Sequence, residues 1–232
     1  MTARDRILGR LRAAGARAAD AGDLERRIDA HFGARREDPP PAADVLAGRM
    51  QAALEAVRAQ AWCVGADAWP ALLAQRIAEA GVRRIVVDAV SPEGRALRAA
   101  LPDGVEALAF ERPLEDWKEE LFGTVDAGFT VARSGIAATG TLVLAPDANA
   151  PRTVSLVPPL HIALVYAHTL HADLHQALHV ERWQDGMPTN LVLATGPSKT
   201  SDIQQTLAFG AHGPRWTWVV IVTDAGDAEE AA

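Results

Sequence analysis

The chain has 232 residues, of which 49% are hydrophobic and 23% are charged, a composition typical of a soluble globular protein with a substantial core. Its net charge of −7 excludes the strongly basic surface that nonspecific nucleic-acid binding requires. No apolar run approaches the roughly 20 residues that span a bilayer, and residues 1–10 lack the apolar stretch of a signal peptide, so we expect a cytoplasmic protein without a membrane span.

The N-terminal part of the chain predicts helices and a linker. Residues 2–32 predict a helix, because apolar residues recur at helical spacing among charged ones. The segment 33–43 contains consecutive prolines and predicts a stiff linker. A second helix is expected near residues 44–59. We therefore expect an N-terminal helical arm with a Pro-rich linker over residues 1–60.

From residue 61 onward, short apolar runs alternate with helical segments. Strands are expected at 62–65, 84–88 and 105–110, and helices at 71–80 and 92–100. This rhythm favours an α/β fold with a mainly parallel sheet and helices on both of its faces. We expect the main domain over residues 61–224 and an acidic tail over residues 225–232.

The second half of the chain is richer in strands. The apolar runs 126–133 and 140–144, joined by the Gly-containing turn 134–139, predict a hairpin. Further strands are expected at 153–157, 161–166, 191–194 and 216–222, and helices at 169–182 and 201–209. The last strand is apolar almost throughout, which indicates burial on both faces.

The segment 195–214 is the most informative part of the chain for function. A Gly-Pro turn opens onto hydroxyls, an ammonium and a carboxylate, a set that can receive an anion beside outward-pointing N–H groups. An ordinary loop with helix-capping residues is the alternative. The spacing of a P-loop or dinucleotide motif is absent, so neither ATP nor NAD is expected. The candidate ligand-binding residues here are Gly196, Pro197, Ser198, Lys199, Thr200, Asp202, His212 and Gly213.

Two other motifs contribute candidate ligand-binding residues. Residues 135–141 offer close approach at Gly140 and the hydroxyls of Thr139 and Thr141, or they form a simple tight turn. His161 follows two prolines at a strand start, where it is a candidate base or hydrogen-bond donor, or is satisfied by a loop carbonyl. Ligands of open α/β sheets lie beyond the carboxyl ends of the strands, so we expect all these residues to converge there.

Histidines and a single cysteine bear on metals and redox centres. Four histidines at spacings of three, four and four are expected on one helical face: His168, His171, His175 and His179. We interpret this row as a solvated face and expect no metal site, because zinc requires further ligands. Cys63 excludes an internal disulfide and a four-thiolate iron–sulfur cluster held by this chain alone. Its apolar surroundings predict a buried, unreactive thiol.

These segments together resemble the LUD domain of the lactate utilization protein C (LutC) family. The matching blocks occur in order at residues 128–130, 136–141, 156–161, 195–203 and 210–214. The Gly-Pro-Ser-Lys-Thr-Ser-Asp-Ile and His-Gly-Pro sequences are the specific part of the resemblance. Family members commonly carry a glutamate where this chain has Ala138, so an acid–base role of that glutamate would be missing here.

The resemblance implies a Rossmann-like, mainly parallel sheet of the ribose-5-phosphate isomerase, glucosamine-6-phosphate deaminase and CoA-transferase type. It implies a part in oxidising L-lactate to pyruvate with iron–sulfur partner proteins, this chain being a non-redox subunit or accessory protein without a cofactor. A small carboxylate or phosphate is the expected ligand. A stand-alone isomerase or transferase acting on a phosphorylated or CoA-linked metabolite is one alternative, and a scaffold is another. Whether the chain itself catalyses a step stays open.

Overall fold

The structure is a computed structural model that describes residues 2–15, 21–200 and 207–223. Its internal contacts divide the chain between Pro40 and Pro41 into two units, and each unit is described on its own. Within the described ranges, no helix combines the length and the apolar character needed to cross a membrane.

The first unit contains two helices, α1 (Ala3–Ala13) and α2 (Ala21–Gly33), in place of the single helix expected over residues 2–32. A capping box starts α1. The Thr2 hydroxyl accepts the N–H of Asp5 at 3.2 Å, and the Asp5 carboxylate accepts the N–H of Thr2 at 2.9 Å. Neither helix has a buried residue, so local capping rather than core packing defines where α1 begins.

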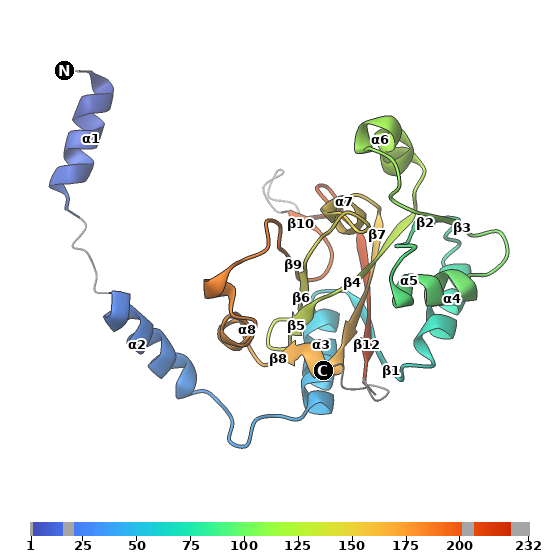
Figure 1. Ribbon diagram of the computed structural model, residues 1–232, viewed down its shortest axis with the longest axis horizontal. Helices are drawn as coiled ribbons and strands as arrows, with labels where there is room; N and C mark the ends of the chain where they lie inside the picture. Colours follow the sequence, from blue (N-terminus) through green and yellow to red (C-terminus); the bar gives the residue numbers. More distant parts are fainter. Residues whose placement is uncertain (1, 16–20, 201–206, 224–232) are drawn as a thin grey trace. The chain divides into compact units, whose positions relative to one another are not determined.

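The second unit is built on a sheet of six parallel strands in the order β1-β12-β7-β4-β2-β3 (Figure 1). The strands are β1 (Gln60–Val64), β2 (Arg84–Val86), β3 (Glu106–Leu108), β4 (Ala127–Val131), β7 (Leu160–Tyr166) and β12 (Trp216–Val222). The inner strands β7 and β12 are buried over almost their whole length, as their apolar sequences require. The expected α/β fold with a mainly parallel sheet is confirmed.

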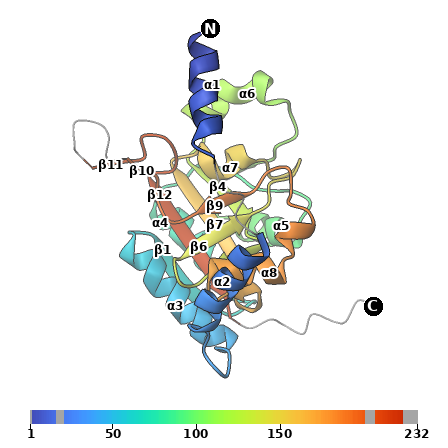
Figure 2. The same cartoon turned by 90° about the vertical axis from the view of Figure 1, so that its left-hand side faces the viewer.

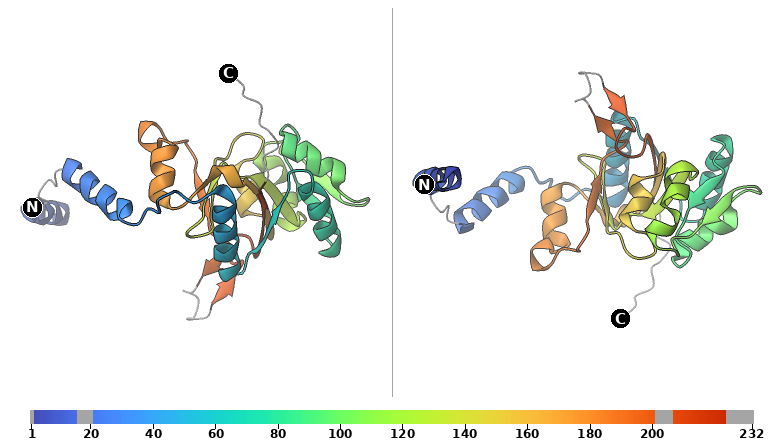
Figure 3. Two further views of the ribbon diagram at one scale, coloured as in Figure 1. Left: turned by 90° about the horizontal axis from the view of Figure 1, so that it is seen from below. Right: turned by 90° about the horizontal axis from the view of Figure 1, so that it is seen from above.

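Helices cover both faces of this sheet (Figure 3). The helices α4 (Trp69–Glu79) and α5 (Pro92–Ala100) share one core cluster with Ile162 and Leu164 of β7. The helix α3 (Ala43–Ala56) packs on the opposite face, in a cluster with the alternate β7 residues. This alternation along β7 follows from the two-residue period of a strand.

Helix α3 is part of the main domain. It buries Leu46, Ala47, Met50 and Leu54 in the core cluster of the sheet, and the boundary between the two units precedes it. We expected this helix in the N-terminal arm of residues 1–60, because an amphipathic pattern does not reveal which surface a helix covers.

A second, mixed sheet of four strands lies next to the first, in the order β8-β5-β6-β9. Its strands are β5 (Ser134–Ile136), β6 (Thr141–Leu144), β8 (Leu170–His171) and β9 (Val192–Ala194). The antiparallel hairpin joins β5 to β6, whereas the expected first strand, residues 126–133, contributes β4 to the main sheet. The strands β4 and β5, which follow each other in the chain, therefore belong to different sheets.

Helices α6 (Leu114–Gly123) and α7 (Arg152–Leu156) share a further cluster with Val86 of β2. The strand expected at residues 153–157 is therefore wrong, although its residues include β-branched ones. Pro151 precedes α7, and packing on β4 outweighs the local strand propensity.

Two other expected helices differ in the structure. The region 169–182 contains a 3₁₀ turn (Ala167–Thr169), β8 and a short α8 (Leu174–Val180), which begins where the Asp173 side chain accepts the N–H of Gln176 at 2.7 Å. The region 201–209 ends in β11 (Ala208–Phe209), which pairs antiparallel with β10 (Lys199–Thr200); residues 201–206 lie outside the described ranges. Figure 2 shows this ladder beside β12.

Candidate functional site

The Thr-Gly-Thr turn belongs to a chain of hydroxyl groups. The hydroxyl oxygen of Thr141 lies 2.6 Å from that of Thr139 and 2.7 Å from that of Thr195. Gly140 has a φ of 64°, and a Cβ there would lie 2.8 Å from the backbone nitrogen of Leu54. The turn therefore needs glycine for its dihedral angle and for its close packing on α3. Sequence patterns did not indicate Thr195, because a single hydroxyl residue before a turn has no distinctive spacing.

The two turns of the candidate anion loop hold each other through backbone hydrogen bonds. The Ser198 N–H donates to the Pro214 carbonyl at 2.8 Å, and the Gly210 N–H donates to the Ser198 carbonyl at 2.9 Å. Gly213 packs on Ser198, since a Cβ on this glycine would lie 3.2 Å from the serine Cβ. Pro197 is buried beside them. These contacts bring together two motif segments that the sequence separates.

The loop also rests on α3 and on the segment before β7. Gly196 has a φ of 69°, and a Cβ there would lie 2.7 Å from the side chain of Val57. The Pro159 carbonyl accepts the N–H groups of Arg215 at 2.8 Å and of Trp216 at 3.0 Å. The Pro-Pro motif thereby positions the chain as it enters β12.

The motif residues lie beside the amino ends of the central strands. Trp216 and Leu160, the first residues of β12 and β7, pair with each other. The expected convergence beyond the carboxyl ends is therefore wrong. Residues 210–214 precede β12, and His161 is the second residue of β7, so both belong to the opposite end of the sheet.

His161 is a buried, neutral imidazole. Only 2% of the residue is exposed, and its Nε2 lies 2.8 Å from the hydroxyl of Thr130 on β4. Burial lowers the pKa of His161 to about 4, because an imidazolium loses its hydration there. At neutral pH this side chain therefore acts through a hydrogen bond and carries no charge.

The depressed pKa predicts an acid-sensitive step in folding stability. The unfolded chain takes up a proton on His161 near its ordinary pKa of 6.5, while the folded chain resists protonation down to about 4. Between these values, stability should fall by up to about 1.4 kcal/mol for each pH unit. Urea unfolding of the wild type and of His161→Gln from pH 7 to pH 4 measures this. An equal pH dependence of the two proteins would contradict it.

Lys199 is exposed and lies in β10, where it pairs with Phe209 of β11. Its expected place at the start of a helix over residues 201–209 depends on residues 201–206, which lie outside the described ranges; Lys199 itself lies in a strand, and residues 208–209 form the partner strand. Thr200 is partly buried in the same ladder. The candidate residue Asp202 lies outside the described ranges.

Basic side chains gather around this ladder. The guanidinium carbon of Arg58 lies 4.8 Å from the ring centre of Phe209, and that of Arg215 lies 4.9 Å from the ring centre of Trp216. Sequence patterns did not indicate Arg58, which reaches the ladder from the end of α3. The basic residues of this surface are Arg58, Lys199 and Arg215, and His212 is exposed in the turn that precedes β12.

A buried carboxylate, Glu181, is a second polar centre. Its Oε1 accepts the Ser134 hydroxyl and lies 3.1 Å from Nε2 of His171, and its Oε2 accepts the Trp183 indole N–H at 2.9 Å. Arg133 pairs with Oε2 at 3.0 Å. Burial by itself would raise the pKa of Glu181, but these donors outweigh it, so the pKa lies below its usual value.

The four histidines do not share one helix face, so this prediction is wrong. His168 lies in the 3₁₀ turn and His171 in β8, and only His175 and His179 lie on α8. The Nε2 atoms of that pair are 3.0 Å apart. Two imidazoles supply half of the four ligands of a structural zinc site.

Cys63 is exposed, and the prediction of a buried thiol is wrong. It lies on β1, an edge strand of the main sheet, with its Sγ 3.3 Å from the side-chain oxygen of Gln51. Partial burial and then the charge of Glu55 raise the pKa of the thiol, so the protonated, less reactive form is favoured.

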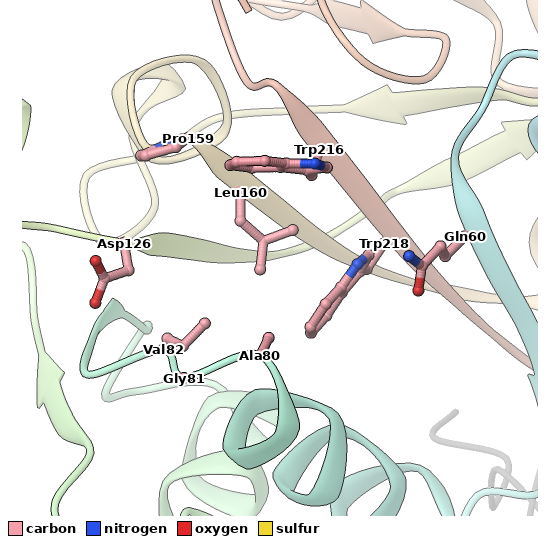
Figure 4. A pocket seen from close by; sticks show the side chains of 9 residues that line it. All are labelled: Gln60, Ala80, Gly81, Val82, Asp126, Pro159, Leu160, Trp216 and Trp218. Atoms are coloured by element: carbon pink, nitrogen blue, oxygen red, sulfur yellow. The ribbon is translucent and has the colours of Figure 1, made fainter.

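A cavity of about 380 Å³ lies at the amino ends of the strands (Figure 4). Figure 4 shows the rings of Trp216 and Trp218 near Leu160, with Asp126 toward one end and Gln60 toward the other. The Asp126 carboxylate accepts two backbone N–H groups at the start of β2, at 2.8 and 2.9 Å, so it serves the fold. The mainly apolar walls suit an apolar group.

Known proteins resemble most of this chain. The LUD domain profile matches residues 47–222. An uncharacterized protein of Neisseria meningitidis serogroup B is 43% identical over 166 residues, which cover 71% of each protein. A crystal structure of a DUF162 family protein from Deinococcus radiodurans shares the fold, with a TM-score of 0.59 and 23% sequence identity, over 79% of this chain and 99% of that chain.

Other relatives have names that refer to lactate. Lactate utilization protein C of Anoxybacillus flavithermus is 33% identical over 97 residues, which cover 42% of this chain and 44% of that protein. Lactate utilization protein C 1 of Bacillus mycoides is 36% identical over 103 residues, which cover 43% of this chain and 44% of that protein. The matched segment therefore spans less than half the length of these two relatives.

Proposed function

This chain belongs to the LUD domain family, and we propose that it takes part in lactate utilization as a non-redox protein that works with iron–sulfur partners. The names of several relatives support a role in lactate utilization. Oxidation of lactate to pyruvate releases two electrons and two protons. The single cysteine of this chain cannot supply the four thiolates of an iron–sulfur cluster, so partner proteins would accept the electrons.

The main support for the proposal is that family motif segments lie in contact with each other beside a basic surface. Backbone hydrogen bonds and close packing link the segments that contain Pro159, Ser198 and Gly213. Lys199 lies on the neighbouring ladder, next to Arg58. On a chain with a net charge of −7, such a basic surface attracts a small carboxylate. We assign this surface the role of binding lactate, pyruvate or a similar anion.

Growth of the native host tests the physiological role. Deletion of the gene should abolish growth on L-lactate and leave growth on pyruvate unchanged, and the wild-type gene should restore it. Iron and acid-labile sulfide that co-purify with the tagged chain from lactate-grown cells, but leave it in high salt, would identify the partner class. Normal growth of the deletion strain on L-lactate would contradict the proposal and favour a stand-alone enzyme.

Lys199→Ala should weaken the binding of L-lactate or pyruvate about tenfold, which corresponds to about 1.4 kcal/mol. The loss is at the lower end for a charge-assisted contact, because the ammonium is exposed to water. The other lysine of the chain, Lys118, is also exposed and lies on α6, so Lys118→Ala is a matched control. Calorimetric titration at low salt measures both variants. Equal affinities of the two variants would remove Lys199 from the site.

A further inference from the structure

A cleft of about 480 Å³ lies next to α7 and is separate from the basic surface described above. Three segments that are far apart in the sequence line it. They contribute Phe110 and Leu114 near the start of α6, Pro146 and Arg152 around the turn that leads into α7, and Asn190 before β9. None of its lining residues is one of the candidate ligand-binding residues expected from the sequence.

A second cavity next to this cleft is lined by polar residues of β4 and α7. This smaller cavity of about 30 Å³ shares Pro146 with the cleft and is lined by Thr130 and Ser155, both buried. The hydroxyl of Thr130 is the hydrogen-bond partner of His161. The cavity beside Thr130 therefore shares a wall residue with the cleft, and no described interaction links the Thr130–His161 pair to the basic surface around Lys199.

We propose that this cleft binds a small organic anion, in which a carboxylate or phosphate group lies next to an apolar group. Arg152 is exposed on the wall, and among the described residues it has no ion pair. Thr153 also lines the cleft, and its buried hydroxyl has no hydrogen-bond partner in the described part of the chain. A ligand oxygen would satisfy this hydroxyl after a change of rotamer, and Asn190 adds an exposed amide.

The walls divide by chemistry in a way that selects such a ligand. Phe110, Leu114 and Pro146 contribute apolar surface to the walls, and Arg152 contributes a positive charge. Asp147 is the acidic residue of the wall, but its Oδ1 already accepts the N–H groups of residues 149 and 150, each at 2.8 Å. An anion with an apolar group therefore matches both the charge of Arg152 and the apolar walls.

Phenyl phosphate is a suitable probe, with phenol and inorganic phosphate as its two halves. Methyl NMR signals of Leu114, assigned with a Leu114→Ile variant, report binding in the cleft alone. Phenyl phosphate should shift these signals in the full chain at submillimolar concentration, and each half should bind at least tenfold more weakly. No shift of the Leu114 signals up to 10 mM probe, or an equal affinity for phenol, would overturn the proposal.

Arg152→Gln should weaken phenyl phosphate binding at least tenfold in the same titration, because it removes the charge-assisted contact. Arg83→Gln removes one exposed charge elsewhere on the domain and is the matched control. Lys199→Ala should leave the Leu114 titration unchanged, so failure of the lactate site and failure of this cleft are distinguishable. Wild-type affinity of Arg152→Gln, with its fold verified by circular dichroism, would overturn the assignment of Arg152.

Discussion

Glu181→Ala should lower the free energy of unfolding by about 1.5–3 kcal/mol, the range for hydrogen bonds to a charged group. The side chain is only 9% exposed, and its oxygens satisfy the Ser134 hydroxyl, the Trp183 indole and the Arg133 guanidinium. Alanine leaves the donors of Ser134 and Trp183, two buried residues, without this acceptor. Urea unfolding at pH 7 measures the difference from the wild type.

Two controls separate charge from packing. Glu181→Gln keeps the volume and one acceptor oxygen, so its loss of stability should be smaller than that of alanine. Glu119→Ala removes an exposed carboxylate of α6 and should change stability by less than about 0.5 kcal/mol. If Glu181→Ala is as stable as Glu119→Ala, the network contributes nothing to the fold.

The same carboxylate predicts a second pH window. Because the pKa of Glu181 is lowered in the folded state, its stabilisation is complete above the ordinary value of 4.5 and is lost as the pH falls through the folded pKa. The effect of His161 occurs at higher pH, between 6.5 and about 4. Acid unfolding curves of Glu181→Gln and His161→Gln should therefore differ from the wild type in different pH ranges.

Gly128→Ala should destabilise the domain by about 3 kcal/mol, the upper end for overpacking. A Cβ at this position would lie 2.1 Å from the carbonyl oxygen of Val154 in α7. A backbone atom cannot rotate away as a side chain can, so α7 or β4 must shift. Ser155 of α7 and Thr130 of β4 both line the smaller cavity of about 30 Å³, so the shift would also disturb that cavity.

Gly48→Ala is the matched control for this glycine. Gly48 lies in the exposed part of α3, and no atom lies within 4 Å of a Cβ built there. Alanine should therefore stabilise the protein by about 0.5–1 kcal/mol, because it favours helix formation. Thermal unfolding compares the two variants. A Gly128→Ala protein as stable as the wild type would show that α7 is not held against β4.

Hydrophobic periodicity predicted the main strands, because the burial of each strand is visible in the apolar pattern of its own residues. The apolar runs of β7 and β12 are buried on both faces, and the sequence therefore places them inside a covered parallel sheet. The expected helix over residues 92–100 coincides with α5, which Ser91 caps by accepting the N–H of Gly94 at 3.0 Å. Local hydrogen bonds of this kind are readable from neighbouring residues.

The motif segments are distinctive and occur in order along the chain, so they identify the family without a structure. Which residues form a site depends instead on contacts between distant parts of the chain. Glu181 meets the Ser134 hydroxyl across 47 positions, and Arg58 reaches Phe209 from the end of α3. Pairing of the first residues of β7 and β12 decided which end of the sheet carries the motifs. Such contacts depend on strand order and helix packing, and neither can be inferred from the pattern of neighbouring residues in the sequence.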